Sequence, residues 1–123
     1  MLSTFSERWV PSMQAYAIGH LRNVVLGPAI IEYLERIDET LEPFGGQFII
    51  HGARPDVKEG NWEGDLIVIA FPSRQNADDW YASSAYQVIK RLRSDHVDGD
   101  ILLIDGVDPG HKASDILIAV QEA

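Results

Sequence analysis

Apolar residues follow two different periods along this chain, and these periods separate predicted strands from predicted helices. Short apolar runs bounded by turn residues predict strands, and apolar residues that recur every three or four positions predict amphipathic helices. Strands are expected at residues 16–21, 47–52, 65–71 and 100–107. The run at 65–71, DLIVIAF, is the most strand-like stretch of the chain.

Two helices are predicted between these strands. The first begins at Pro28, because proline suits a first helical position, and it ends before Gly45. The second follows Ser73, a good N-cap residue, and is expected to break or to start again at Ser83. A short apolar helix over 114–122 closes the chain. The apolar stripe of the first helix consists of Ile30, Leu34, Ile37, Leu41 and Phe44.

The predicted order is strand, helix, strand, strand, helix, strand, followed by a terminal helix. This order fits the ferredoxin-like βαββαβ arrangement of the α+β class, in which four strands form an antiparallel sheet and both helices lie on one face. Residues 15–107 are therefore expected to form one domain. An N-terminal arm over 1–14 precedes it, and a C-terminal helical extension over 108–123 follows it.

The predicted sheet has an apolar pattern on both of its faces. An antiparallel sheet with one face in water normally alternates polar and apolar residues. Residues 66–71 (LIVIAF), 101–104 (ILLI) and 48–50 (FII) instead form unbroken apolar runs. The face without helices would therefore expose large aliphatic side chains, which normally marks an interaction surface. A homodimer that packs sheet against sheet about a two-fold axis is expected.

Composition excludes several classes of function. The chain has 123 residues and a formal net charge of −9. That charge argues against nucleic acid as a partner, because phosphate-backbone binding needs a basic surface. Cysteine is absent, which excludes disulfides, thiolate nucleophiles and cysteine-ligated metals. The sequence shows neither a signal-peptide core nor an apolar run of membrane-spanning length, so a cytoplasmic protein without a membrane partner is expected.

Several stretches carry a resemblance to a known family. The most specific is the pattern FPS…A…WY-x-S-x-x-Y over residues 71–86, and residues 16–21, 42–46 and 48–62 support it. The sequence resembles the domain-of-unknown-function family 1330 of the dimeric α/β-barrel superfamily over about residues 15–107. The resemblance implies a ferredoxin-like protomer and a two-sheet barrel dimer. It implies no single reaction, because the superfamily includes cofactor-free monooxygenases, lactone isomerases and haem-binding chlorite dismutases.

Two histidines are the candidate catalytic residues. His20 lies in the middle of the first strand, on the face shared by Tyr16 and Ile18, where it would serve as a general base or as an anion partner. His51 ends the second predicted strand, three residues before Arg54, whose guanidinium would hold a carboxylate at the mouth of a pocket. The competing interpretations are a packed, hydrogen-bonded His20 and a solvated loop whose cations pair with nearby acids.

The candidate ligand-binding aromatics are Trp62, Trp80, Tyr81 and Tyr86, together with Arg54. Trp80 and Tyr81 are helical neighbours and diverge by about one hundred degrees, so one is expected to pack on the sheet while the other reaches sideways. Aromatic walls with a few polar groups are typical of a small-molecule pocket. The alternative interpretation is that these residues fill the core between helix and sheet.

No cofactor and no metal site are predicted, because the sequence lacks phosphate-loop and metal-ligand spacings. Two functions stay open. One is a cofactor-free isomerase or monooxygenase-like enzyme that binds a small anionic or aromatic molecule in a cleft between sheet and helices. The other is a non-catalytic ligand-binding or structural dimer. They differ in whether His20, His51, Arg54 and Tyr81 converge on one pocket.

Overall fold

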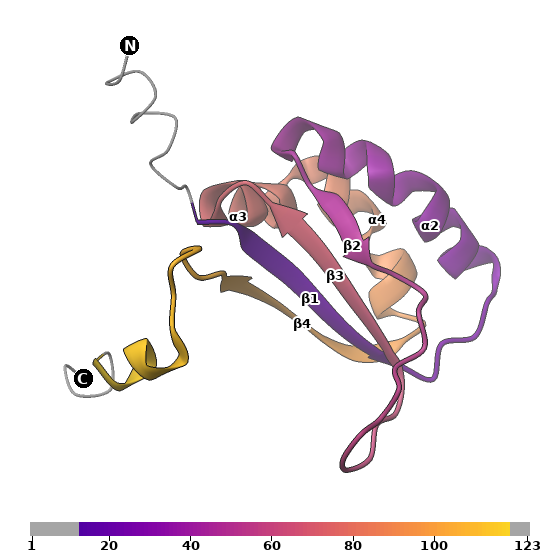
Figure 1. Ribbon diagram of the computed structural model, residues 1–123. Helices are drawn as coiled ribbons and strands as arrows, with labels where there is room; N and C mark the ends of the chain where they lie inside the picture. Colours follow the sequence, from indigo (N-terminus) through magenta and orange to yellow (C-terminus); the bar gives the residue numbers. More distant parts are fainter. Residues whose placement is uncertain (1–12, 119–123) are drawn as a thin grey trace.

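A computed structural model of the protein describes residues 13–118 (Figure 1). Its elements are β1 (Ala15–Arg22), α2 (Pro28–Leu41), the 3-10 helix η1 (Glu42–Phe44), β2 (Gln47–Ile50), β3 (Asp65–Phe71), α3 (Arg74–Ala82), α4 (Ser84–Ser94), β4 (Asp98–Asp105) and the 3-10 turn η2 (Ala113–Asp115). The predicted order is confirmed, with the second helix divided in two. Among the described residues, no helix is both long and apolar enough to cross a membrane.

The four strands form one antiparallel sheet in the order β2-β3-β1-β4. In the centre, Ala17 lies opposite Ile69 of β3 on one side and Leu103 of β4 on the other. Helices α2, α3 and α4 all lie on one face of this sheet (Figure 1). The ferredoxin-like α+β fold is therefore confirmed. The outer strands end differently from the prediction, since β2 stops at Ile50 and β4 covers Asp98–Asp105.

The core lies between the sheet and the helices. In β1 the buried residues alternate, so that Ala15, Ala17 and Gly19 face the helices. Their small side chains leave room for larger groups from the helices and from β3. The largest fully buried side chains are Trp80, Tyr86, Phe71 and Ile89.

Capping residues fix where the helices start and stop. Pro28 opens α2, and Gly45 ends η1 with a φ of 71°, in the left-handed region that favours glycine. The Ser83 hydroxyl donates to the Trp80 carbonyl at 2.7 Å and accepts from the Tyr86 amide at 3.2 Å. Ser83 therefore ends α3 and begins α4, as the sequence predicts.

The buried face of α4 differs from the one that its apolar spacing predicts. In the sequence, the residues Ala85, Val88, Ile89 and Leu92 recur at helical spacing and predict a core-facing stripe, but Val88 is 67% exposed. Tyr86, Ile89 and Arg93 are the buried residues of α4. The break at Ser83 resets the helix, so that a face containing a tyrosine and an arginine meets the sheet and α2.

No helix within residues 13–118 covers the second face of the sheet. This face carries the residues of β1 that alternate with the buried ones, Tyr16, Ile18 and His20. Leu102 and Ile104 of β4 are each 47% exposed on this face. We call this surface the open face. Within the part of the chain that the structure describes, the sequence prediction of an apolar, helix-free sheet surface is confirmed.

The predicted terminal helix does not cover the open face as far as it is described. The segment at 116–118 follows η2 as helix and extends away from the end of β4 (Figure 1). Its residues Ile116, Leu117 and Ile118 are each more than half exposed. The remainder of that predicted helix, and nearly all of the predicted N-terminal arm, lie outside the described residues.

Candidate functional site

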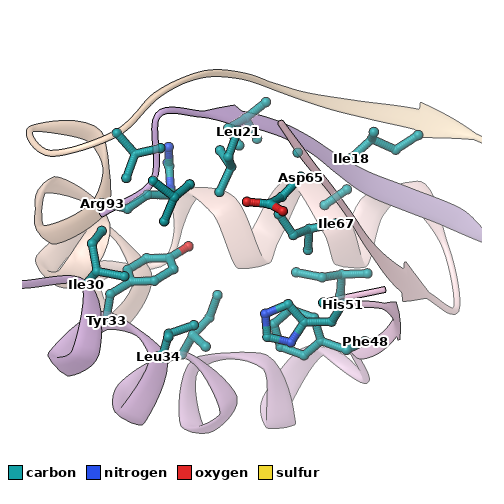
Figure 2. Close-up of a pocket in the computed structure, with 18 of the residues that line it drawn as sticks. Ile18, Leu21, Ile30, Tyr33, Leu34, Phe48, His51, Asp65, Ile67 and Arg93 are labelled. Atoms are coloured by element: carbon teal, nitrogen blue, oxygen red, sulfur yellow. The ribbon is translucent and has the colours of Figure 1, made fainter. Parts of the chain in front are cut away.

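A cavity of about 240 Å³ lies between the sheet and α2 (Figure 2). Most of its wall is aliphatic or aromatic. Helix α2 contributes Ile30, Tyr33, Leu34 and Ile37; the sheet contributes Ala17, Gly19, Leu21, Phe48, Ile67, Ile69 and Ile101; and α4 contributes Tyr86 and Arg93. Besides the two tyrosines, three polar side chains interrupt this wall, namely Arg93, Asp65 and His51.

Arg93 is the buried cation of the cavity. It is 7% exposed and lies in the last turn of α4. Its Nη2 donates to the Tyr86 hydroxyl at 3.4 Å, and its guanidinium carbon lies 5.8 Å from the centre of the Tyr33 ring. Within residues 13–118 it makes no ion pair with an acid, and its buried Nε has no hydrogen-bond partner.

Two tyrosines extend this polar cluster. The hydroxyls of Tyr33 and Tyr86 are hydrogen bonded at 2.8 Å. Burial, reinforced by Tyr86, raises the pKa of the Tyr33 hydroxyl far above its ordinary value, so this phenol stays protonated. Burial lowers the pKa of Arg93, but its contacts with Tyr86 and Tyr33 outweigh that effect, so the pKa stays raised and the guanidinium stays charged. The cluster presents a cation and neutral hydroxyls to an apolar cavity.

Asp65 and His51 lie elsewhere on the cavity wall. Figure 2 places Arg93 and Tyr33 at one end, His51 on Phe48 at the other, and the Asp65 carboxylate pointing into the space between them. The His51 ring stacks on Phe48 with centroids 4.5 Å apart. Both polar residues are exposed, as expected at the mouth of the cavity.

Three of the predicted site residues line this cavity. His51 lies at its mouth, and Tyr86 and Trp80 are in its wall. Trp80 is 1% exposed, and its indole N–H donates to the Thr40 hydroxyl at 2.9 Å. The interpretation of Trp80 as a core residue therefore agrees with its burial, although its ring also borders the cavity.

His20, His51, Arg54 and Tyr81, whose convergence separates the two open functions, do not meet at this cavity, and only His51 lines it. His20 alternates with the buried residues of β1, so it lies on the open face, across the sheet from the cavity. Its Nε2 donates to the Glu63 carbonyl at 2.6 Å, and its ring stacks on Trp62 with centroids 4.3 Å apart. Trp62 therefore covers His20 and does not line the cavity.

The other two residues lie outside the cavity for different reasons. Arg54 belongs to the exposed connection between β2 and β3, where Lys58 pairs with Asp56 at 2.9 Å as the solvated-loop interpretation expects. Tyr81 is half-buried beside Trp80, and Lys90 lies 5.7 Å from the centre of its ring. Tyr81 thus packs against the buried rings of Trp80 and Tyr86 and does not line the cavity.

Sequence reasoning missed Arg93, Tyr33 and Asp65. In the sequence, Arg93 stands with Lys90 and Arg91 in what looks like a small basic surface patch, yet it follows Ile89 by four positions and Tyr86 by seven. That spacing puts it on the buried face of the helix. An arginine at the spacing of the buried residues Tyr86 and Ile89 is the sequence feature that would have indicated the site.

No group of three or more metal-ligating side chains occurs among residues 13–118. The polar residues of the cavity are one cation, one acid, one imidazole and two phenols. This set suits hydrogen bonding and charge pairing with an organic molecule.

The fold and the cavity define a small α+β protein of ferredoxin-like topology with an internal, mostly apolar pocket. The sequence profile of the domain of unknown function DUF1330 matches residues 14–107, so the chain belongs to that family. No curated protein sequence matches the chain closely enough to show a relationship.

Solved structures that resemble this one include two of the same protein. The first is the crystal structure of methylated RPA0582 protein, with a TM-score of 0.60 and 15% identity, covering 90% of this chain and 95% of the other. The second is RPA0582, a protein of unknown function from Rhodopseudomonas palustris, with a TM-score of 0.61 and 15% identity, covering 89% of this chain and 95% of the other. At this identity the likeness shows the fold alone.

Proposed function

We propose that the protein binds a small, mostly apolar monocarboxylate in the cavity between the sheet and α2, with the carboxylate held by Arg93. One observation carries the proposal: Arg93 lines the cavity, is buried, and has no acidic partner among the described residues. A buried charge is costly unless it is paired and hydrogen bonded. A ligand carboxylate would supply the missing pair.

The surroundings of Arg93 offset only part of that cost. The negative end of the α4 dipole and the face of the Tyr33 ring both favour a cation at this position. Neither supplies an acceptor for Nε, which stays unpaired. Arginine binds carboxylates through two parallel N–H···O bonds, so a bound acid would satisfy it in a way that a dipole or a ring does not.

The size and the apolar walls of the cavity indicate the size and chemistry of the part of the ligand beyond its carboxylate. A cavity of about 150 Å³ lined by aliphatic and aromatic groups accommodates benzene. The present volume of about 240 Å³ suits a single ring with a short acidic substituent. Leu34, Ile67 and Phe48 would contact the ring.

The proposal is one of binding rather than of catalysis. An isomerase or monooxygenase-like activity was expected to use His20 or His51 on one bound molecule. His20 lies on the open face, and His51 lies at the mouth of the cavity on the opposite side of the sheet. This separation favours the non-catalytic ligand-binding alternative.

Calorimetric titration with phenylacetate tests the proposal. We expect saturable binding to the wild-type protein and at least a tenfold weaker affinity in Arg93→Met, because a hydrogen-bonded charge pair contributes about 1.5–3 kcal/mol. Arg91→Met is the matched control, since Arg91 is on the same helix but is 79% exposed in its pair with Asp95. Equal affinity in Arg93→Met, or no binding by phenylacetate, would contradict the proposal.

We also propose that the open face packs against the same face of a second copy, which gives a homodimer. The support is the exposure of Leu102 and Ile104 on that face, together with Ile50, which is 38% exposed on β2. Burying such side chains contributes about 25 cal/mol per Å² of apolar surface. The cavity lies on the helix side of the sheet, so this pairing leaves it accessible to a ligand.

A further inference from the structure

We infer that the ligand of the cavity carries a hydrogen-bond donor away from its carboxylate, read by Asp65, so that its class is a hydroxylated or amino-substituted aryl carboxylate. This inference rests on the proposed binding of a carboxylate by Arg93. It adds a second recognition point, and with it a chemical class, to that site.

The position of Asp65 is the first observation. Asp65 begins β3 and lies opposite Leu21 of β1, so its side chain is on the helix side of the sheet. Its carboxylate points into the cavity, between Arg93 and His51 (Figure 2). Within residues 13–118, no hydrogen bond or ion pair from another side chain reaches this carboxylate.

The charges on the wall are the second observation. An ionised carboxylate only accepts hydrogen bonds, and it repels a like charge. A ligand with its acid at Arg93 and no other polar group would leave Asp65 facing an apolar ring. A ligand with a hydroxyl or amino group at the far side of that ring would donate to Asp65 instead. Opposite ends of one molecule would then complement the two charged residues.

His51 limits the arrangement at the mouth. Its ring is stacked on Phe48, at the end of the cavity away from Arg93 (Figure 2). A donor that reaches Asp65 therefore lies between two polar side chains of an otherwise apolar cavity. A methoxy group at the same place would bring only an acceptor to Asp65.

Three acids that differ only in the group at position 4 of the ring test whether Asp65 recognises a hydrogen-bond donor: phenylacetate, 4-hydroxyphenylacetate and 4-methoxyphenylacetate. For the wild-type protein, we expect 4-hydroxyphenylacetate to bind about tenfold more tightly than phenylacetate, because a hydrogen bond to a charged group is stronger than one between neutral groups. We expect 4-methoxyphenylacetate to bind no better than phenylacetate. This comparison needs no mutant protein.

The variant Asp65→Asn then locates the effect. We expect it to bind 4-hydroxyphenylacetate and phenylacetate with affinities within about twofold of each other, while its phenylacetate affinity equals or exceeds that of the wild type. Asp56→Asn removes the same charge from the exposed β2–β3 connection, where its side chain is 82% exposed, and should keep the wild-type preference.

The outcomes distinguish this inference from the proposed function. If phenylacetate binding depends on Arg93 but the hydroxyl brings no gain, or if the gain survives in Asp65→Asn, the inference about Asp65 is overturned and carboxylate binding stands. If none of the three acids binds, both fail. The inference is supported if 4-hydroxyphenylacetate binds more tightly than phenylacetate to the wild type and to Asp56→Asn, but not to Asp65→Asn.

Discussion

The hydroxyl oxygens of Tyr33 and Tyr86 lie 2.8 Å apart, so a hydrogen bond joins α2 to α4 beside the cavity. Arg93 donates to the same Tyr86 hydroxyl, which makes Tyr86 the centre of a three-residue cluster. Tyr33 is at the edge of this cluster, and it lines the cavity. The same polar groups therefore join two helices and line the proposed ligand site.

Removing the Tyr86 hydroxyl should lower the free energy of unfolding more than removing the Tyr33 hydroxyl. Tyr33→Phe leaves Tyr86 in contact with Arg93, and we expect a loss of about 1 kcal/mol in the free energy of unfolding. Tyr86→Phe also removes the acceptor of the buried guanidinium, so we expect a loss of about 2–3 kcal/mol. Urea unfolding of both variants checks this order. Equal losses would show that the contact between Arg93 and Tyr86 contributes little.

Alkaline pH should destabilise the protein through Tyr33. Burial raises the pKa of this phenol above its ordinary value of 10.0. Above pH 10 the unfolded chain releases the proton while the folded chain keeps it, so the free energy of unfolding falls by up to about 1.4 kcal/mol per pH unit. Urea unfolding from pH 9 to pH 11 should show this slope reduced in Tyr33→Phe. Tyr16→Phe, which removes a phenol from the open face, is the control, and an unchanged slope in Tyr33→Phe would contradict the prediction.

The hydroxyl of Thr40, which accepts from Trp80, should contribute more to the free energy of unfolding than the methyl group of the same side chain. Thr40→Val keeps the shape but leaves the indole N–H buried without its acceptor, and we expect a loss of about 1–3 kcal/mol in unfolding free energy. Thr40→Ser retains the hydroxyl and should lose less. Chemical unfolding followed by tryptophan fluorescence measures both. A smaller loss in Thr40→Val than in Thr40→Ser would assign the main role to packing of the methyl group.

Arg93→Met should make the unliganded protein more stable. Replacing a poorly paired buried charge with an apolar side chain of similar length is often neutral or stabilising, and we expect a gain of about 1 kcal/mol. Thermal unfolding without ligand measures the change, with the exposed Arg91→Met as the reference. A loss of several kcal/mol would identify Arg93 as a structural residue instead of a ligand-binding one.

The proposed homodimer should depend on the open face. Leu102→Arg places a charge on the β4 side of that face, and we expect the protein to sediment as a 13.7 kDa monomer at micromolar concentration. Val88→Arg makes a comparable change on α4, where Val88 is 67% exposed on the opposite side of the protein, and should remain dimeric. A monomeric wild-type protein under the same conditions would refute the pairing of the two sheets.

The sequence alone determined the elements, their order and the apolar open face. Proline at the start of α2, glycine after η1 and Ser83 between α3 and α4 act through nearby backbone groups, so local spacing was sufficient to place these boundaries. Unbroken apolar runs in β3 and β4 likewise predicted a sheet without a polar face.

Only the tertiary structure decided which polar residues share the cavity. His20 and Arg93 illustrate the reason. The face on which His20 lies depends on which alternate residues of β1 meet the helices, and the rotation of α4 depends on how the chain restarts at Ser83. Both are settled by packing between segments far apart in sequence, which brings Arg93, Tyr33 and Asp65 around one cavity and leaves His20 on the other side of the sheet.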